Sequence, residues 1–170
     1  MQATQLIGQL DRNRILFSTL LDLHHEVPPD WKPEDHKWCL KEIVCHLVDE
    51  EREDFRCRVD QALHRSSDEL APIDPKDWVI SRSYIEQDYE HKCREFLAER
   101  TKSIHWLRSL NDPDWDSFLI HPVIGRLSAF FLLTNWLAHD YLHIRQIIRL
   151  KFDYLAQSTT MPLHYAGDWP

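Results

Sequence analysis

Glycine, positive charge and long apolar runs are all scarce in this sequence. Only 3 of its 170 residues are glycine, whereas an all-β fold with many tight turns needs residues that accept positive φ angles. The 20 basic residues are outnumbered by 28 acidic ones, and the formal charge of -8 repels a phosphate backbone. No run approaches the ~18 uncharged apolar residues of a membrane span, and the N-terminus does not resemble a secretion signal. We therefore expect a helical, cytoplasmic protein that binds neither nucleic acid nor membranes.

Cysteine is present but shows no pattern of pairing. The four cysteines are Cys39, Cys45, Cys57 and Cys93, and none forms the short-spaced pairs of zinc knuckles or disulfide staples. Reduced thiols are the expectation. Histidine is abundant instead, with 11 residues, and imidazole is a common ligand for borderline metals.

Apolar residues recur at helical spacing in four segments, which predicts an all-α four-helix bundle in one domain spanning residues 1–170. The helices are expected from about Leu6 to Leu21, from Leu40 to His64, from Ser83 to Leu110 and from Leu127 to Leu150. The third is predicted to start at a capping box, Ser83 to Glu86. Between the second and third helices, the proline-bearing segment from Arg65 to Ile80 suits a long crossover connection.

Two segments outside the helices have less definite predictions. The stretch from Trp115 to Gly125 is expected to be a packed loop with a short extended piece, because Pro122 and Gly125 interrupt it. We expect this loop and the proline-bearing connection to shape any binding pocket, with His121 either at its mouth or on the surface. The C-terminal tail is given no chemical role.

A histidine pair in the fourth helix is the main chemical signal. Four residues turn a helix by ~400°, so His139 and His143 lie on one side and can share a metal ion. Such a pair also arises by chance, so it needs a third ligand from another helix. His46, in the apolar part of the second helix, is the best candidate, although a lone apolar-face histidine is often a core residue. Three histidines would leave one tetrahedral position open for water or substrate.

Residues near these histidines suggest supporting roles. Glu50 lies one turn beyond His46 and is a candidate catalytic base, while most of the run from Asp49 to Asp54 is predicted to be a solvated acidic face. Asp140 and Gln146 could orient an imidazole, and Trp136 could form a wall of the pocket. The alternative is that the two polar residues face water and that Trp136 is part of the core.

Two other kinds of site fit the sequence poorly. A di-iron carboxylate bundle needs Glu-x-x-His on two helices, and no glutamate here has a histidine three residues later. A cysteine nucleophile activated by its neighbour would use Cys45 and His46. Adjacent helical residues point about 100° apart, so these two side chains cannot share a proton directly.

Two stretches carry a resemblance to a known family. They are Trp38 with Leu40-Lys41-Glu42-Ile43 and His46-Leu47, and the run from Asn135 to Ile147 that includes His139-Asp140-Tyr141-Leu142-His143. Together they resemble the DinB-like family over nearly the whole chain. The resemblance implies an up-down-down-up bundle in which His46, His139 and His143 bind a divalent metal, most often zinc or nickel. It also implies a homodimer.

The resemblance implies several activities. Characterised relatives look like metal-dependent thiol transferases and thiol-linked isomerases, so the first expectation is a thiol S-transferase that takes a small-molecule substrate and a low-molecular-weight thiol. The physical basis is that a metal-bound thiol loses its proton at neutral pH. The alternatives are a metal-dependent hydrolase with Glu50 as base, or a non-catalytic, metal-stabilised bundle with a sensing or docking role.

Overall fold

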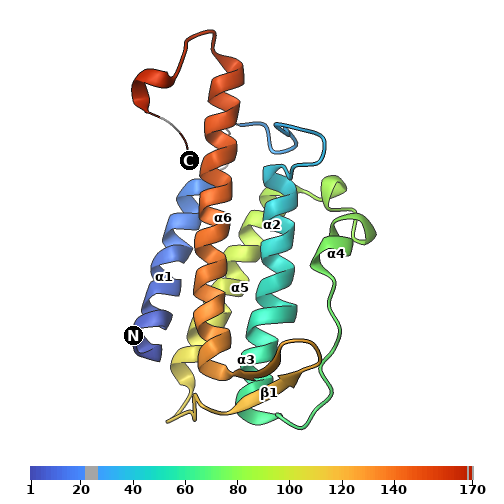
Figure 1. Cartoon of the computed structure of the whole chain (residues 1–170), viewed down its shortest axis with the longest axis vertical. Coiled ribbons are helices and arrows are strands. Elements are labelled where there is room, and N and C mark those ends of the chain that lie inside the picture. The colour runs from blue at the N-terminus through green and yellow to red at the C-terminus, as the bar shows by residue number, and fades with distance from the viewer. Residues whose placement is uncertain (22–26, 168, 170) are drawn as a thin grey trace.

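The computed structural model describes residues 1–21, 27–167 and 169 (Figure 1). The helices are α1 (Ala3–Leu20), α2 (Leu40–Asp49), α3 (Arg56–His64), α4 (Pro75–Ser81), α5 (Tyr89–Ser109) and α6 (Ala129–Ser158). A π-helical segment (Glu50–Phe55) joins α2 to α3, and two short 3-10 turns occupy Tyr84–Glu86 and His164–Ala166. The strands are β1 (Phe118–His121) and β2 (Gly125–Ser128). Among the described residues, no helix combines the length and apolar character of a membrane span.

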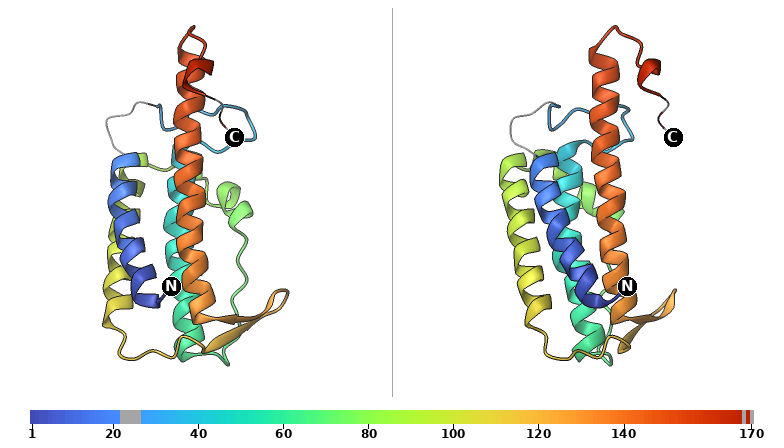
Figure 2. Two further views of the ribbon diagram at one scale, coloured as in Figure 1. Left: turned by 60° about the vertical axis from the view of Figure 1, so that its left-hand side comes forward. Right: turned by 90° about the vertical axis from the view of Figure 1, so that its left-hand side faces the viewer.

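The long helices form a four-helix bundle with an up-down-down-up topology. In the view of Figure 1, α1 and α6 run upward, whereas α2 with α3, and α5, run downward. The helices α1 and α2 each pack against α5 and α6, so they lie diagonally across the bundle, as the turned views of Figure 2 also show. Residues 65–88 connect α3 back to the start of α5 at the opposite end. The predicted fold, with its long crossover, is confirmed.

The second long helix runs from Leu40 to His64 as predicted, but its middle is a π-helical segment rather than regular α-helix. A π turn adds one residue per turn and rotates the side chains that follow it. The prediction that most of the run from Asp49 to Asp54 is a solvated acidic face is wrong for Asp49 and Glu51, which are buried like Glu50. Arginines from other segments supply partners for Asp49 and Glu51.

The predicted start of the third helix is also wrong. Ser83 has a left-handed backbone conformation with φ of 47°, and a single 3-10 turn follows it. The helix α5 begins at Tyr89, where the Asp88 carboxylate accepts a 2.6 Å hydrogen bond from the backbone N–H of His91. Contacts distant in sequence override the local capping signal, since the Tyr84 hydroxyl donates to buried Asp49 at 2.7 Å.

The region before α6 is a β-hairpin, which confirms the predicted extended piece and corrects the start of the last helix. The strands β1 and β2 pair antiparallel, with Leu119 opposite Leu127. Both leucines are buried. Leu127 therefore belongs to a strand, and α6 begins only at Ala129, where the Ser128 hydroxyl accepts from the backbone N–H of Phe131. The helix extends to Ser158, beyond the predicted end at Leu150.

A buried polar layer separates two apolar clusters in the core. One cluster includes Leu10, Val59 and Trp136 and the other includes Phe17, Leu47 and Ile147. In each long helical segment, one buried polar residue of the layer lies between the residues of one cluster and those of the other. These residues are Asn13 from α1, Glu51 from the π segment, Arg100 from α5 and Asp140 from α6.

Arg100 is the centre of this polar layer. Its Nη1 and Nη2 donate to the two carboxylate oxygens of Asp140, both at 2.7 Å, and its Nε donates to Glu51 at 2.9 Å. Asn13 donates to Asp140 at 3.0 Å, and the indole N–H of Trp136 donates to Glu51 at 2.9 Å. The layer thus pairs one buried cation with two buried carboxylates and gives them neutral donors as well.

Replacing Arg100 tests whether this layer holds the bundle together. Arg100→Met leaves two buried carboxylates without their cation, so we expect a loss of about 3–5 kcal/mol in the free energy of unfolding, measured by urea denaturation. The matched control is Arg108→Met, because Arg108 is 52% exposed and pairs with Asp11 at the surface. The control should lose less than about 1 kcal/mol. Equal losses in the two variants would contradict this role for Arg100.

Candidate metal centre

Three histidine side chains from two antiparallel helices converge inside the bundle. His46 comes from α2, and His139 and His143 come from successive turns of α6. The Nε2 atom of His139 lies 3.2 Å from Nε2 of His46 and 3.0 Å from Nε2 of His143. The potential ligand atoms of all three residues lie within 4.8 Å of one another. The structure therefore brings together the three residues that the sequence singled out.

Aromatic rings enclose this group, which we call the histidine cluster. The ring of Trp38, just before α2, lies 4.9 Å from the ring of His46 between centroids. The ring of Phe55, at the end of the π segment, lies 5.0 Å from the ring of His139. Two of the imidazoles, those of His46 and His143, are buried.

Burial keeps the imidazoles neutral. Desolvation is the largest of the causes that lower the pKa of His46 to about 3 and that of His139 to about 2, and the charge of His143 contributes to both shifts. Desolvation also lowers the pKa of His143, although Gln146 and the Asp140 carboxylate act in the opposite direction. Neutral imidazole is the form that binds metals, so the histidine cluster needs no deprotonation to do so near pH 7.

The geometry of the cluster fits a divalent metal ion. Tetrahedral zinc with bonds of ~2.05 Å to nitrogen separates its ligand atoms by roughly 3.3 Å, close to the two Nε2–Nε2 distances given above. The same contacts are also compatible with hydrogen bonds between neutral imidazoles, in which the tautomers decide which Nε2 donates and which accepts. The Nδ1 atoms of His46 and His143 are buried, and no hydrogen-bond partner for either lies among the described residues.

Glu50 is buried but faces other carboxylates. Desolvation and the neighbouring Asp54 carboxylate raise the pKa of Glu50 to about 8, so it is largely protonated at neutral pH. Asp54 in turn pairs with Arg58. In the described part of the chain, the group of residues spaced to hold a metal contains the three histidines and no carboxylate. The assignment of Glu50 as a base stays a prediction.

Among the other residues considered for supporting roles, Trp136 lies in the core, which is the alternative given for it, and His121 lies away from the cavity in the hairpin turn. Both Asp140 oxygens accept from Arg100, and Oδ2 also accepts from Asn13, so this carboxylate anchors the helix between the two histidines. Trp136 is fully buried and stacks on Phe55, which places it in the core behind the cluster. His121 caps the hairpin turn, where its Nδ1 accepts from the backbone N–H groups of Val123 and Ile124 at 3.1 Å.

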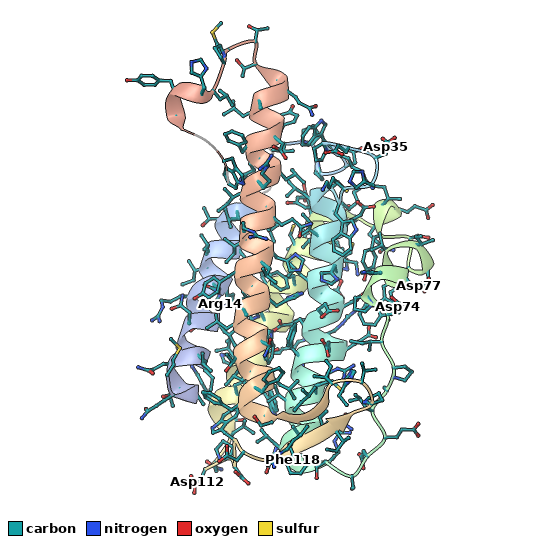
Figure 3. All side chains as sticks on the ribbon, viewed as in Figure 1. Arg14, Asp35, Asp74, Asp77, Asp112 and Phe118 are labelled. Carbon is teal, nitrogen blue, oxygen red and sulfur yellow. The ribbon has the colours of Figure 1, made fainter. Side chains whose placement is uncertain are left out.

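A cavity of about 760 Å³ adjoins the histidine cluster. It lies between the loop before α2, which Asp35 marks in Figure 3, and the exposed side of α6. The residues that line it include Lys37, Trp38, His143, Arg145, Arg149 and Trp169. The expectation that residues 115–125 and the proline-bearing connection shape the pocket is wrong for this cavity. The hairpin lies at the other end of the bundle (Figure 1).

Several important residues of this region escaped the sequence interpretation. Arg100 looks like any helical arginine in the sequence, and only its distant carboxylate partners distinguish it. Trp169 lies in the tail that was given no chemical role, yet its ring packs against Phe152 at 5.2 Å and lines the cavity. The one available signal was the spacing of Arg145 and Arg149, which are one helical turn apart in the same helix as His143.

The lowered histidine pKa values predict a loss of stability in acid for the metal-free protein. An unfolded chain has histidine pKa values near 6.5, so it takes up protons before the folded chain does as the pH falls. The stabilisation that comes from these neutral imidazoles is therefore fully present above about pH 6.5. It is lost as the pH falls from there toward the lower pKa values of the folded protein. Each imidazole can contribute up to about 2 kcal/mol between pH 7.5 and pH 5.

Urea denaturation of metal-free protein at these two pH values provides the measurement. His46→Gln should lose less stability on acidification than the wild type, because glutamine does not titrate. His105→Gln, at an exposed position of α5, should behave like the wild type. An unchanged pH response in His46→Gln would show that burial does not hold the pKa of His46 low.

Comparison with known proteins agrees with this description. A sequence model of the DinB superfamily matches residues 9–147, and no curated protein matches the sequence. The fold is similar to that of YfiT from Bacillus subtilis, described as a probable metal-dependent hydrolase with an unusual four-helix bundle topology. That likeness has a TM-score of 0.76 and 19% sequence identity, and it covers 88% of this chain and 85% of that one. The chain belongs to the DinB superfamily.

Proposed function

We propose that this protein is a divalent-metal enzyme that acts on a small molecule bound in the cavity beside the histidine cluster. His46, His139 and His143 are the proposed ligands, and zinc or nickel is the proposed ion, since three imidazoles suit both. The convergence of the three Nε2 atoms supports this proposal more than any other observation. Because His143 both belongs to the cluster and lines the cavity, a substrate in the cavity would lie against one of the proposed ligands.

As the reaction at this site, we propose the transfer of a low-molecular-weight thiol to an electrophilic substrate. A divalent ion held by three imidazoles supplies a Lewis acid that lowers the pKa of a coordinated thiol or water. A coordinated thiol, whose ordinary pKa is already far below that of water, would release its proton to solvent at neutral pH without a carboxylate at the cluster. Trp38 and Phe55 exclude water around the imidazoles, and Arg100 fixes Asp140 and with it the turn of α6 that carries His139 and His143.

Hydrolysis is the second candidate. The structural likeness to a probable metal-dependent hydrolase favours it, as does the buried position of Glu50 one turn from His46. Glu50 would have to act as a base, and its raised pKa of about 8 predicts that such activity increases through pH 8 as the carboxyl group loses its proton. A thiol transferase has no such requirement for Glu50, so Glu50→Gln separates the two reactions.

We also propose a cellular compartment and an oligomeric state for the protein. A reducing compartment such as the cytoplasm suits the four cysteines, which are free thiols in the structure. A homodimer is what membership of the family suggests.

The metal proposal predicts about one zinc or nickel ion per chain in purified protein, measured by elemental analysis. His139→Ala should lose the ion, because two imidazoles remain and a three-ligand site becomes incomplete. His105→Ala is the matched control, since His105 lies exposed on α5 and should leave the metal content unchanged. Protein without any divalent metal, after growth in media containing zinc and nickel, would end the enzyme proposal.

The thiol proposal predicts a direct spectroscopic response. In cobalt-substituted protein, 2-mercaptoethanol should produce a new near-ultraviolet band as its sulfur reaches the metal, and His105→Ala should show the same band. An unchanged spectrum would remove thiol transfer and leave hydrolysis or a non-catalytic sensing role. Glu50→Gln should then abolish activity for a hydrolase and leave a sensor's ligand binding intact.

A further inference from the structure

Basic side chains gather on the wall of the cavity, although the chain as a whole has a formal charge of -8. Lys37 comes from the loop before α2, and Arg145 and Arg149 come from neighbouring turns of α6. The acidic residues of the same wall are Glu34 and Asp153. The wall therefore carries one more basic than acidic residue within an acidic protein.

The pairing of these charges leaves two cations available. Arg149 donates to Asp153 at 2.9 Å and its guanidinium lies 5.5 Å from the centre of the Trp169 ring. By contrast, the side chains of Arg145 and Lys37 have no hydrogen bond or ion pair within residues 1–21, 27–167 and 169. Arg145 lines the same cavity as His143, which belongs to the histidine cluster.

The rest of the wall is suited to an apolar or aromatic group. Trp38, Leu142 and Trp169 line the same cavity, and the Trp38 ring also packs against His46, as described above. The cavity thus has a cationic part, an aromatic part and an imidazole of the histidine cluster. A cavity of 760 Å³ is large enough for a metabolite-sized ligand.

We propose that this cavity binds a small anionic molecule whose carboxylate or phosphate group is held by Arg145 and Lys37. Its apolar part lies against Trp38, and its reactive end is directed toward His143. The planar guanidinium of arginine can donate two parallel hydrogen bonds to such a group, and charge-assisted bonds of this kind are stronger than neutral ones. The assignment deepens the proposed function, on which it rests for the identity of the reactive end.

Benzoate and benzamide provide a direct test, because they have the same ring and nearly the same shape but differ in charge. Binding to zinc-loaded protein is followed by nuclear magnetic resonance from the indole N–H signals of Trp38 and Trp169. We expect benzoate to bind at least about tenfold more tightly than benzamide. Arg145→Ala should weaken benzoate binding about tenfold and leave benzamide unchanged.

Arg94→Ala is the matched control. Arg94 lies on α5, is 61% exposed and pairs with Glu90, so its loss removes the same charge without touching the cavity. This variant should bind benzoate like the wild type. Equal effects of Arg145→Ala and Arg94→Ala would mean that only the net charge matters and would overturn the proposal.

Either the electrophile or the thiol can carry the anionic group, and a second pair of probes separates these sources. If Arg145→Ala weakens binding of 3-mercaptopropionate but not of 2-mercaptoethanol, the thiol is the anionic partner. If Arg145→Ala weakens the binding of benzoate alone, the electrophile is the anionic partner. Both results support the cationic site.

Elemental analysis of each variant keeps this proposal separate from the metal proposal. If Arg145→Ala retains zinc and binds benzoate as tightly as the wild type does, the anion site is wrong while the metal site stands. If the wild type holds no zinc but still binds benzoate through Arg145, the metal proposal fails and the anion site stands.

Discussion

The buried guanidinium of Arg100 is the interaction on which the arrangement of the helices depends. It joins α5 to the π segment through Glu51 and to α6 through Asp140, and Asn13 adds α1 to the same layer. Asp140 lies between His139 and His143 in sequence, so the ion pair that fixes Asp140 also fixes the rotation of α6. The ion pair between Arg100 and Asp140, which involves no side chain of the histidine cluster, therefore helps to set the geometry of the cluster.

This polar layer explains why the helices have one register rather than several. Apolar clusters lie on both sides of it, and apolar side chains alone tolerate small sliding movements between helices. Here a slide of one turn would leave two carboxylates and a guanidinium buried without partners, which costs several kcal/mol. The π segment belongs to the same constraint, because it directs Glu51 inward toward Arg100 and Phe55 toward His139 within a few residues.

The sequence predicted what depends on local periodicity and missed what depends on distant partners. The four long helices, the crossover and the His139–His143 pair follow from spacing along single segments. The place of His46 in the apolar part of the second helix made it the candidate third ligand, in agreement with the family resemblance. The start of α5 could not be predicted, because Tyr84 is held by Asp49 from another helix. Glu51 looked like one acid among many, since its partner Arg100 is 49 residues away. The cavity combines α6 with a loop about a hundred residues earlier, which no local pattern reveals.

The two sides of the proposed site impose different requirements on a ligand. On the inner side, burial keeps three imidazoles neutral, so that side can offer ring nitrogen lone pairs to a cation. On the outer side, Arg145 and Lys37 are charged, and that side attracts an anion. A ligand that carries both a carboxylate and a group able to coordinate a metal satisfies both sides only in one orientation. Because the remaining charge of the protein is strongly acidic, an anion gains little elsewhere on the surface. Orientation of the substrate thus follows from the placement of charge rather than from a close steric fit.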